Sequence, residues 1–337
     1  MKFHILSSPY SPVHIQNKSD SFSIAVVKFI KNMTKLGWNC IHYGIAGSEV
    51  DCEMIQCLPV IPKDNSDAIH QYNLTAGIEI SKRKLPGDII LCFYGNENQQ
   101  ATLNNQDLII VEPSIGYATA AVFAPYRIFV SNAQMHMFYG ERNMLMNPSW
   151  TDAVIPNAFT PMEFEYSENK KDYVLCFGRV TTGKGVDIAI QATKDSGDRL
   201  IIAGPGSIEN IGYNKLPDHV EYVGVADEYQ RRILMRDAKA IIAPTRYVEP
   251  FGNMVIEGYF SGTPAITTDW GGFTETVIQG ITGFRCRDYS EFITALKNVN
   301  SISSQNCRLW AEKNYTEEVI HKKFDYYFKK LLKNSGN

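Results

Sequence analysis

The stretch from Pro244 to Glu257 reads P-T-R-Y-V-E-P-F-G-N-M-V-I-E. It follows an apolar run, Ala240 to Ala243, that stops at the proline as a buried strand would. After a polar loop, the G-N-M-V-I-E segment can start a helix. The first-turn amides of a helix are free donors at its positive end, which suits an anionic or polyhydroxylated ligand. The stretch therefore predicts a strand, a ligand-binding loop and a helix in succession.

Two carboxylates frame this loop. Glu249 stands before the predicted helix start and Glu257 about two turns inside it. A carboxylate can accept hydrogen bonds from two hydroxyls at once, so the spacing suits holding a sugar-containing ligand at two points. Charged residues recur at this spacing by chance, so the pair is weak evidence alone. The chain continues with Gly262-Thr-Pro and then with Gly271-Gly-Phe-Thr-Glu275.

In this order, Glu-x7-Glu within Glu-Pro-Phe-Gly, then Gly-Thr-Pro, then Gly-Gly-x-x-Glu closely resembles the retaining glycosyltransferases of the GT-B fold, family 4 type. The resemblance implies an α/β chain of two Rossmann-like, doubly wound domains facing a cleft. It also implies a nucleoside-diphosphate sugar as donor, with no cofactor and no metal. It is firm over most of residues 125–315 and holds in outline before them. In its compact length the chain also resembles short glycosyltransferases of bacteriophages and large DNA viruses.

Composition agrees with this class. The 337 residues leave room for two domains, and the net charge of −3 provides no global positive field to recruit nucleic acid. Seven scattered cysteines without a Cys-x-x-Cys pair indicate reduced thiols. The scattered histidines show no metal-ligand spacing, so we expect no metal site. Because no signal peptide or long apolar run is evident, we expect a cytoplasmic protein, in the host cytoplasm if it is viral.

Residues 1–157 are predicted to form the acceptor-side domain. A strand at 1–6, a helix at 22–36 and a strand at 39–43 open it as a doubly wound domain would. The turn after the first strand is rich in Ser, Pro and Tyr, where family relatives usually have glycine. Relatives also carry a histidine-bearing turn further on, whereas this chain has Glu112 at the carboxyl end of a predicted strand, 107–112. Glu112 is our candidate for an acceptor-side catalytic carboxylate, the alternative being a structural cap on the turn at Ser114.

Residues 158–172 read as a linker and 173–314 as the nucleotide-sugar-binding domain, with 315–337 a helix that crosses back to the first domain. An apolar strand leads into Gly178-Arg-Val-Thr-Thr-Gly-Lys184-Gly. This resembles the family's Gly-Arg…Lys-Gly element, which implies that Arg179 and Lys184 hold the donor diphosphate. The resemblance further implies that Glu249 holds the donor sugar and Glu257 the ribose. The other donor-binding candidates are Phe251, Gly252, Asn253, Gly178, Gly204 and Val225.

Rival functions remain open. Sugar-nucleotide epimerases and phosphorylases share the GT-B architecture, and a catalytically silent relative would act as a scaffold subunit. The acceptor is equally open between a glycan, a lipid, a protein and a hydroxymethylated base of viral DNA. The acidic balance of the first half argues against DNA, because duplex binding depends on neutralising phosphates. A DNA base would also have to be flipped out of its stack.

Overall fold

The computed structural model describes residues 1–15, 21–60 and 65–334. The chain divides into two compact units. Unit 1 comprises Met1–Ala158 together with the segment from Glu317 onward, and unit 2 comprises Phe159–Thr316.

Unit 1 is built on a parallel sheet that, in the described residues, has seven strands in the order β3-β2-β1-β4-β5-β6-β7. The strands are β1 (Lys2–Leu6), β2 (Asn39–Ile45), β3 (Glu53–Leu58), β4 (Ile89–Cys92), β5 (Ile109–Ile115), β6 (Tyr126–Phe129) and β7 (Ala153–Val154). The α-helices are α1 (Ser21–Lys35), α2 (Asn65–Arg83), α3 (Gln99–Thr102), α4 (Asn132–Glu141) and α11 (Glu317–Asn334).

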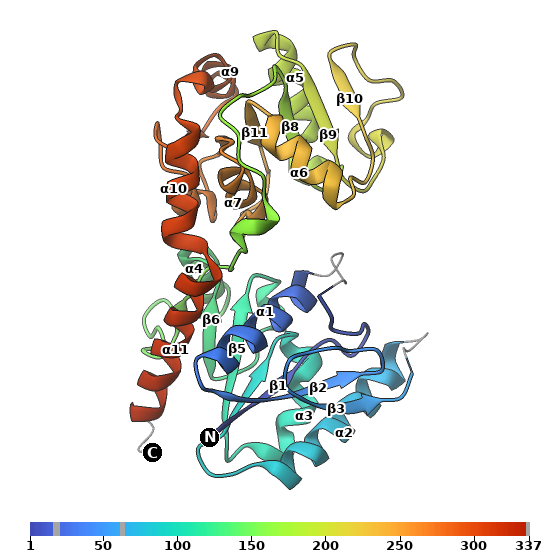
Figure 1. The fold of residues 1–337 in the computed structure, drawn as a ribbon, viewed down its shortest axis with the longest axis vertical. Helices are drawn as coiled ribbons and strands as arrows, with labels where there is room; N and C mark the ends of the chain where they lie inside the picture. The colour runs from blue at the N-terminus through green and yellow to red at the C-terminus, as the bar shows by residue number, and fades with distance from the viewer. Residues whose placement is uncertain (16–20, 61–64, 335–337) are drawn as a thin grey trace. The chain divides into compact units, whose positions relative to one another are not determined.

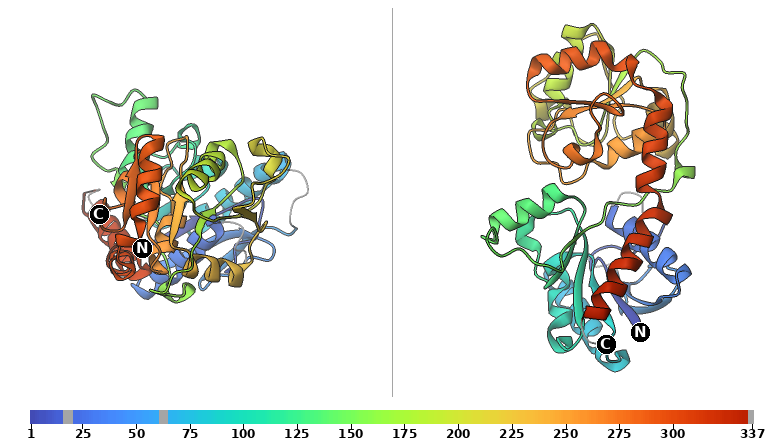
Figure 2. Two further views of the ribbon diagram at one scale, coloured as in Figure 1. Left: turned by 90° about the horizontal axis from the view of Figure 1, so that it is seen from above. Right: turned by 90° about the vertical axis from the view of Figure 1, so that its left-hand side faces the viewer.

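Both faces of this sheet are covered, because successive side chains of a strand point to opposite faces. Phe3 and Ile5 of β1 share one core with buried residues of α1 and α11, whereas Leu6 belongs to a second core with α2. Helix α11 lies along α1 (Figures 1 and 2), and its Phe324 and Phe328 pack against the ring of Phe29. The C-terminal helix is thus part of the core of unit 1.

Unit 2 has its own parallel sheet, which in the described part of the chain runs β10-β9-β8-β11-β12-β13. The strands are β8 (Val174–Phe177), β9 (Leu200–Ala203), β10 (Val220–Tyr222), β11 (Ala240–Ala243), β12 (Ala265–Thr268) and β13 (Gly283–Cys286). The α-helices are α5 (Val186–Ser196), α6 (Glu228–Asp237), α7 (Asn253–Phe260), α8 (Phe273–Thr276), α9 (Tyr289–Asn298) and α10 (Ser304–Tyr315). With two such sheets, the predicted pair of Rossmann-like, doubly wound units is confirmed.

The strand order of unit 2 creates a switch point between β8 and β11. The chain runs outward from β8 to β10 and then returns to β11 on the other side of β8. Loops that leave these two neighbouring strands therefore diverge to opposite faces, which opens a crevice at the carboxyl ends where doubly wound sheets bind their ligands. In unit 1 the equivalent point lies between β1 and β4.

We expected residues 158–172 to form a linker; in the structure Ala158 belongs to unit 1, and residues 159–172 pack against the rest of unit 2. The ammonium of Lys170 donates hydrogen bonds to the backbone oxygens of Arg236 (2.8 Å) and Ser261 (2.9 Å) and to Oγ1 of Thr263 (2.9 Å). Burial lowers the pKa of Lys170 to about 8. The ring of Phe164 also stacks on Phe260. This segment therefore has fixed contacts within its unit.

Candidate functional site

The switch point of unit 2 brings together the two motifs singled out in the sequence. The loop after β8 carries Arg179 and Lys184, and the loop after β11 carries Glu249. Because β8 and β11 are adjacent and parallel, both loops leave the sheet at the same edge. Helix α7, which holds Glu257, begins directly after the second loop.

Lys184 and Glu249 form the centre of this site. Nζ of Lys184 lies 2.8 Å from Oε2 of Glu249, and the same oxygen accepts a 2.8 Å hydrogen bond from the hydroxyl of Tyr247. The ammonium also lies 5.0 Å from the centre of the Tyr247 ring. Burial alone would lower the pKa of Lys184, but the charge and hydrogen bond of Glu249 outweigh it and raise the pKa. The lysine is therefore a cation at neutral pH.

The two loops are held to each other at several points. Gly185 has φ +68°, and a Cβ there would overlap the backbone oxygen of Pro244. The backbone N–H of Arg246 donates to the oxygen of Gly183 at 2.9 Å, and its guanidinium makes a bidentate pair with Asp187 at 2.7 and 2.6 Å. These contacts fix Lys184 relative to the loop that carries Glu249.

The downstream Gly-Gly pair supports the same loop. A Cβ on Gly271 would come within 2.6 Å of the Glu249 backbone oxygen, and one on Gly272 within 2.7 Å of the Phe251 Cα. The N–H of Gly272 donates to the oxygen of Glu249 at 2.7 Å. The Gly-Gly motif is thus a close backbone contact that holds Glu249 in place.

At the start of α7, Gly252 is the N-cap residue with φ +86°, and Asn253 is the first residue of the helix. Gly252 has no side chain to cap the first turn. Phe251 is buried, and its ring packs near those of Phe159 and Tyr315. Its side chain therefore anchors the loop, so any role in donor binding falls to its backbone.

Glu257 has a partner that the sequence did not suggest. It is 8% exposed, and its Oε1 pairs with Nη2 of Arg231 on α6. No sequence signal links these residues, because they lie on separate helices with β11 between them. Arg246 and Tyr247, in contrast, lie within the stretch that defines the site and could have been found there.

The remaining donor-side candidates lie at the same edge of the sheet. Arg179 is exposed, and among the described residues it has no hydrogen bond or ion pair. Gly178, with φ +139°, has open space where a Cβ would project. A Cβ on Gly204 would overlap the oxygen of Gly178, and the Gly204 N–H donates to Gly224 at 2.7 Å. Val225, directly after Gly224, is 71% exposed.

Glu112 lies in unit 1 and is fully buried on β5. Both carboxylate oxygens lie 3.2 Å from the backbone N–H of Phe123, which donates to them. Burial raises the pKa of Glu112 to about 8, although hydrogen bonds from the N–H groups of Phe123 and Ala124 partly oppose the shift. In this structure the carboxyl group thus holds the segment before β6.

We expect the Glu112→Gln variant to gain stability relative to the wild type as pH rises. Unfolded Glu112 ionises near its ordinary pKa of 4.5, whereas folded Glu112 keeps its proton to about pH 8. The wild type therefore loses stability between these pH values, by an amount on the order of 2–4 kcal/mol, and the variant does not. Urea unfolding from pH 5 to 8.5 measures the difference. The exposed Glu53→Gln serves as control, and a pH-independent difference would contradict the expectation.

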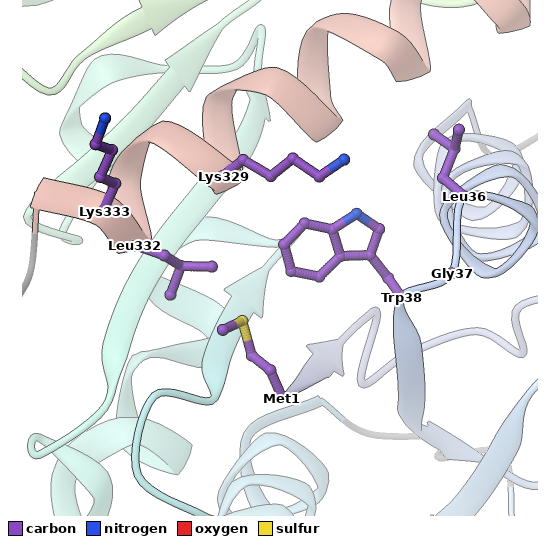
Figure 3. A pocket seen from close by; sticks show the side chains of 7 residues that line it. All are labelled: Met1, Leu36, Gly37, Trp38, Lys329, Leu332 and Lys333. Carbon is purple, nitrogen blue, oxygen red and sulfur yellow. The ribbon is translucent and has the colours of Figure 1, made fainter. Parts of the chain in front are cut away.

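A shallow groove of about 520 Å³ lies elsewhere, on unit 1. Figure 3 shows its lining residues, with the indole of Trp38 between Met1 and Lys329. None of our candidate residues lines this groove. Within the described ranges no cluster of three or more His, Cys, Asp or Glu side chains is arranged to hold a metal ion. In the same ranges, every helix is too short or too polar to span a membrane.

Comparison with known proteins identifies the segment that carries the site. Residues 171–301 match the family described as Glycosyl transferases group 1. This part of unit 2 is similar to group 1 glycosyltransferase domains. It contains the Arg179–Lys184 loop, Glu249 and Glu257, so the match supports the predicted relationship to glycosyltransferases over these residues.

Curated relatives agree with the match to the group 1 glycosyltransferase domain. The glycogen synthase of Mycobacterium tuberculosis is 33% identical over 138 residues, which are 37% of this chain and 33% of that protein. An uncharacterized glycosyltransferase of Methanocaldococcus jannaschii is 26% identical over 296 residues, 84% of this chain and 75% of the relative. The chain thus spans only about a third of the glycogen synthase.

Solved structures extend the likeness to the fold of the whole chain. The sucrose-phosphate synthase of Thermosynechococcus elongatus has a TM-score of 0.74 at 18% identity, covering 99% of this chain and all of that chain. HepE of Anabaena, in complex with UDP and glucose, has a TM-score of 0.71 at 14% identity, covering 98% and 100%. The group 1 domain therefore belongs to a chain with the GT-B type of fold.

Proposed function

We propose that the chain is a retaining glycosyltransferase that moves a sugar from a nucleoside-diphosphate donor to an acceptor hydroxyl. The observation that carries the proposal is the 2.8 Å pair between Lys184 and Glu249 at the switch point of unit 2. The group that would hold the leaving diphosphate and the group that would hold the sugar lie side by side. In the proposed complex they would flank the bond that breaks.

Arg179 and Lys184 would stabilise the departing diphosphate. As the bond from the anomeric carbon to the phosphate oxygen breaks, negative charge grows on that oxygen and the sugar becomes oxocarbenium-like. Cations already in place where this charge develops lower the barrier more than they favour the ground state. They supply the positive charge that a divalent cation would otherwise provide, so the proposed reaction requires no metal.

Glu249 would accept hydrogen bonds from hydroxyls of the donor sugar, and Glu257 from those of the ribose. The backbone amides of Phe251, Gly252 and Asn253 lie at the positive end of α7, which favours an electron-rich ligand. The open space beside Gly178 would leave room for the nucleotide, the close contact of Gly204 with Gly178 would hold this backbone in place, and Val225 would lie beside the base. These roles are those that the resemblance of the two motifs implies, and the positions of the residues at or near the carboxyl edge of the sheet are compatible with them.

The acceptor hydroxyl would form the new bond to the anomeric carbon from the side that the diphosphate leaves. Its proton would pass to the leaving phosphate oxygen, so that the products are the glycoside and a nucleoside diphosphate. This front-face displacement retains the anomeric configuration, which is the outcome implied by the resemblance of the motifs to retaining glycosyltransferases. The HepE complex with UDP and glucose supports a nucleotide-sugar donor. The acceptor, including a hydroxymethylated DNA base, stays a prediction.

The test is a panel of UDP-, GDP-, ADP- and dTDP-linked sugars without acceptor. We expect one donor to raise the melting temperature of the protein and to be hydrolysed slowly, with the free sugar detected by mass spectrometry. Detection of an epimerised nucleotide sugar would show that the chain is an epimerase and would contradict the transferase proposal. If no donor in the panel stabilises the protein and none is turned over, the proposal is contradicted and a silent scaffold subunit is favoured.

A further inference from the structure

Arg231 joins three elements of unit 2 at the candidate donor site. It lies on α6, its guanidinium pairs with Glu257 on α7, and its guanidinium carbon lies 5.4 Å from the ring centre of Phe177 at the end of β8. The Arg231 side chain is 36% exposed, and that of Glu257 is 10% exposed. The pair thus stands at the border between the interior and the ligand-binding edge.

The contact between Arg231 and Glu257 leaves hydrogen-bonding capacity on both side chains. Oε1 of Glu257 pairs with Arg231, while Oε2 accepts no hydrogen bond from the described residues. Nε of Arg231 is buried and also has no hydrogen-bond partner there. Nε of the neighbouring Arg232 is buried and unpartnered in the same way, so what distinguishes Arg231 is the carboxylate that it holds, which belongs to the candidate site.

We propose that Arg231 is a positioning residue for the donor nucleotide, which holds one oxygen of Glu257 so that the other accepts the ribose hydroxyls. The inference rests on the proposed function, since it assumes a nucleotide at this site. Without Arg231, the Glu257 carboxylate would rotate freely about its side-chain bonds. Fixing it in advance reduces the entropy lost when the nucleotide binds.

The experiment measures the affinity of UDP, GDP and ADP and of their 2′,3′-dideoxy forms by calorimetry. We expect wild type to prefer the ribose form of its nucleotide by about tenfold or more. In Arg231→Met, affinity for the ribose form should fall about 10- to 100-fold, affinity for the dideoxy form should change little, and the preference should nearly vanish. Arg231→Lys should restore part of the preference.

A double-mutant cycle separates positioning from direct contact. If Arg231 acts through Glu257, the losses in Arg231→Met and Glu257→Gln should be strongly non-additive in the double variant. The matched control is Arg232→Met, because Arg232 lies next on the same helix and pairs with Glu228 at 2.6 Å. Circular dichroism checks that each variant is folded. If Arg231→Met does not fold, Arg231→Lys is used for the test instead.

The outcomes distinguish this inference from the proposed function. Equal losses for the ribose and dideoxy forms would overturn it, since Arg231 would then act on the phosphates. Unchanged affinity in Arg231→Met, or a wild type indifferent to the ribose hydroxyls, would overturn it too. A wild type that binds no nucleotide and transforms no donor would contradict the proposed function itself.

Discussion

Replacing Lys184 with Met is expected to lower the rate of sugar transfer by about 10²–10³-fold, with little effect on folding. The ammonium is the cation that lies against Glu249, 2.8 Å away, and removing one preorganised charge from a developing anion costs about this much. The measurement is kcat for transfer, or for donor hydrolysis when no acceptor is known. Because Lys184 acts mainly as the diphosphate leaves, kcat should fall more than KM rises.

The matched control for this variant is Lys194→Met, which removes an exposed lysine from the far part of α5. The control should keep wild-type turnover and melting temperature. Turnover near the wild-type value in Lys184→Met would show that Lys184 takes no part in the reaction. The proposed function would then lose the observation that supports it.

Gly185→Ala is expected to damage both the fold of unit 2 and its activity. At φ +68° an alanine is strained by about 1–2 kcal/mol, and its Cβ would overlap the backbone oxygen of Pro244. Relief requires the two loops to separate, which would move Lys184 away from Glu249. We expect the melting temperature to fall by about 5–10 °C and transfer to drop by about 100-fold or more.

The control is Gly183→Ala, two residues earlier in the same loop. A Cβ there would meet only the Tyr247 ring at 3.7 Å and Oγ1 of Thr181 at 3.9 Å, which are ordinary contacts. Thermal unfolding followed by circular dichroism, together with donor hydrolysis, compares the two variants. Equal melting temperatures and activities in both would show that the contact between Gly185 and Pro244 does not hold the site.

Local patterns in the sequence were sufficient for the fold. Apolar runs such as Ala240–Ala243 and Leu200–Ala203 are strands buried on both faces, and amphipathic segments between them are helices. Alternating strands and helices fold into parallel sheets by short-range connections, so the architecture follows from the order of the elements. The motif loops were likewise found because each lies within a few residues of a strand end.

Residue patterns along the chain were therefore enough to predict the two doubly wound units and the loops that carry Arg179, Lys184 and Glu249. The pairing of Arg231 with Glu257 and the burial of Glu112 against Phe123 became visible only in the folded chain. The physical reason is that strand order and helix packing bring together residues on different elements. The spacing of residues along the chain does not predict such contacts. A carboxylate near the end of a predicted strand looks the same in sequence whether it faces a ligand or the core.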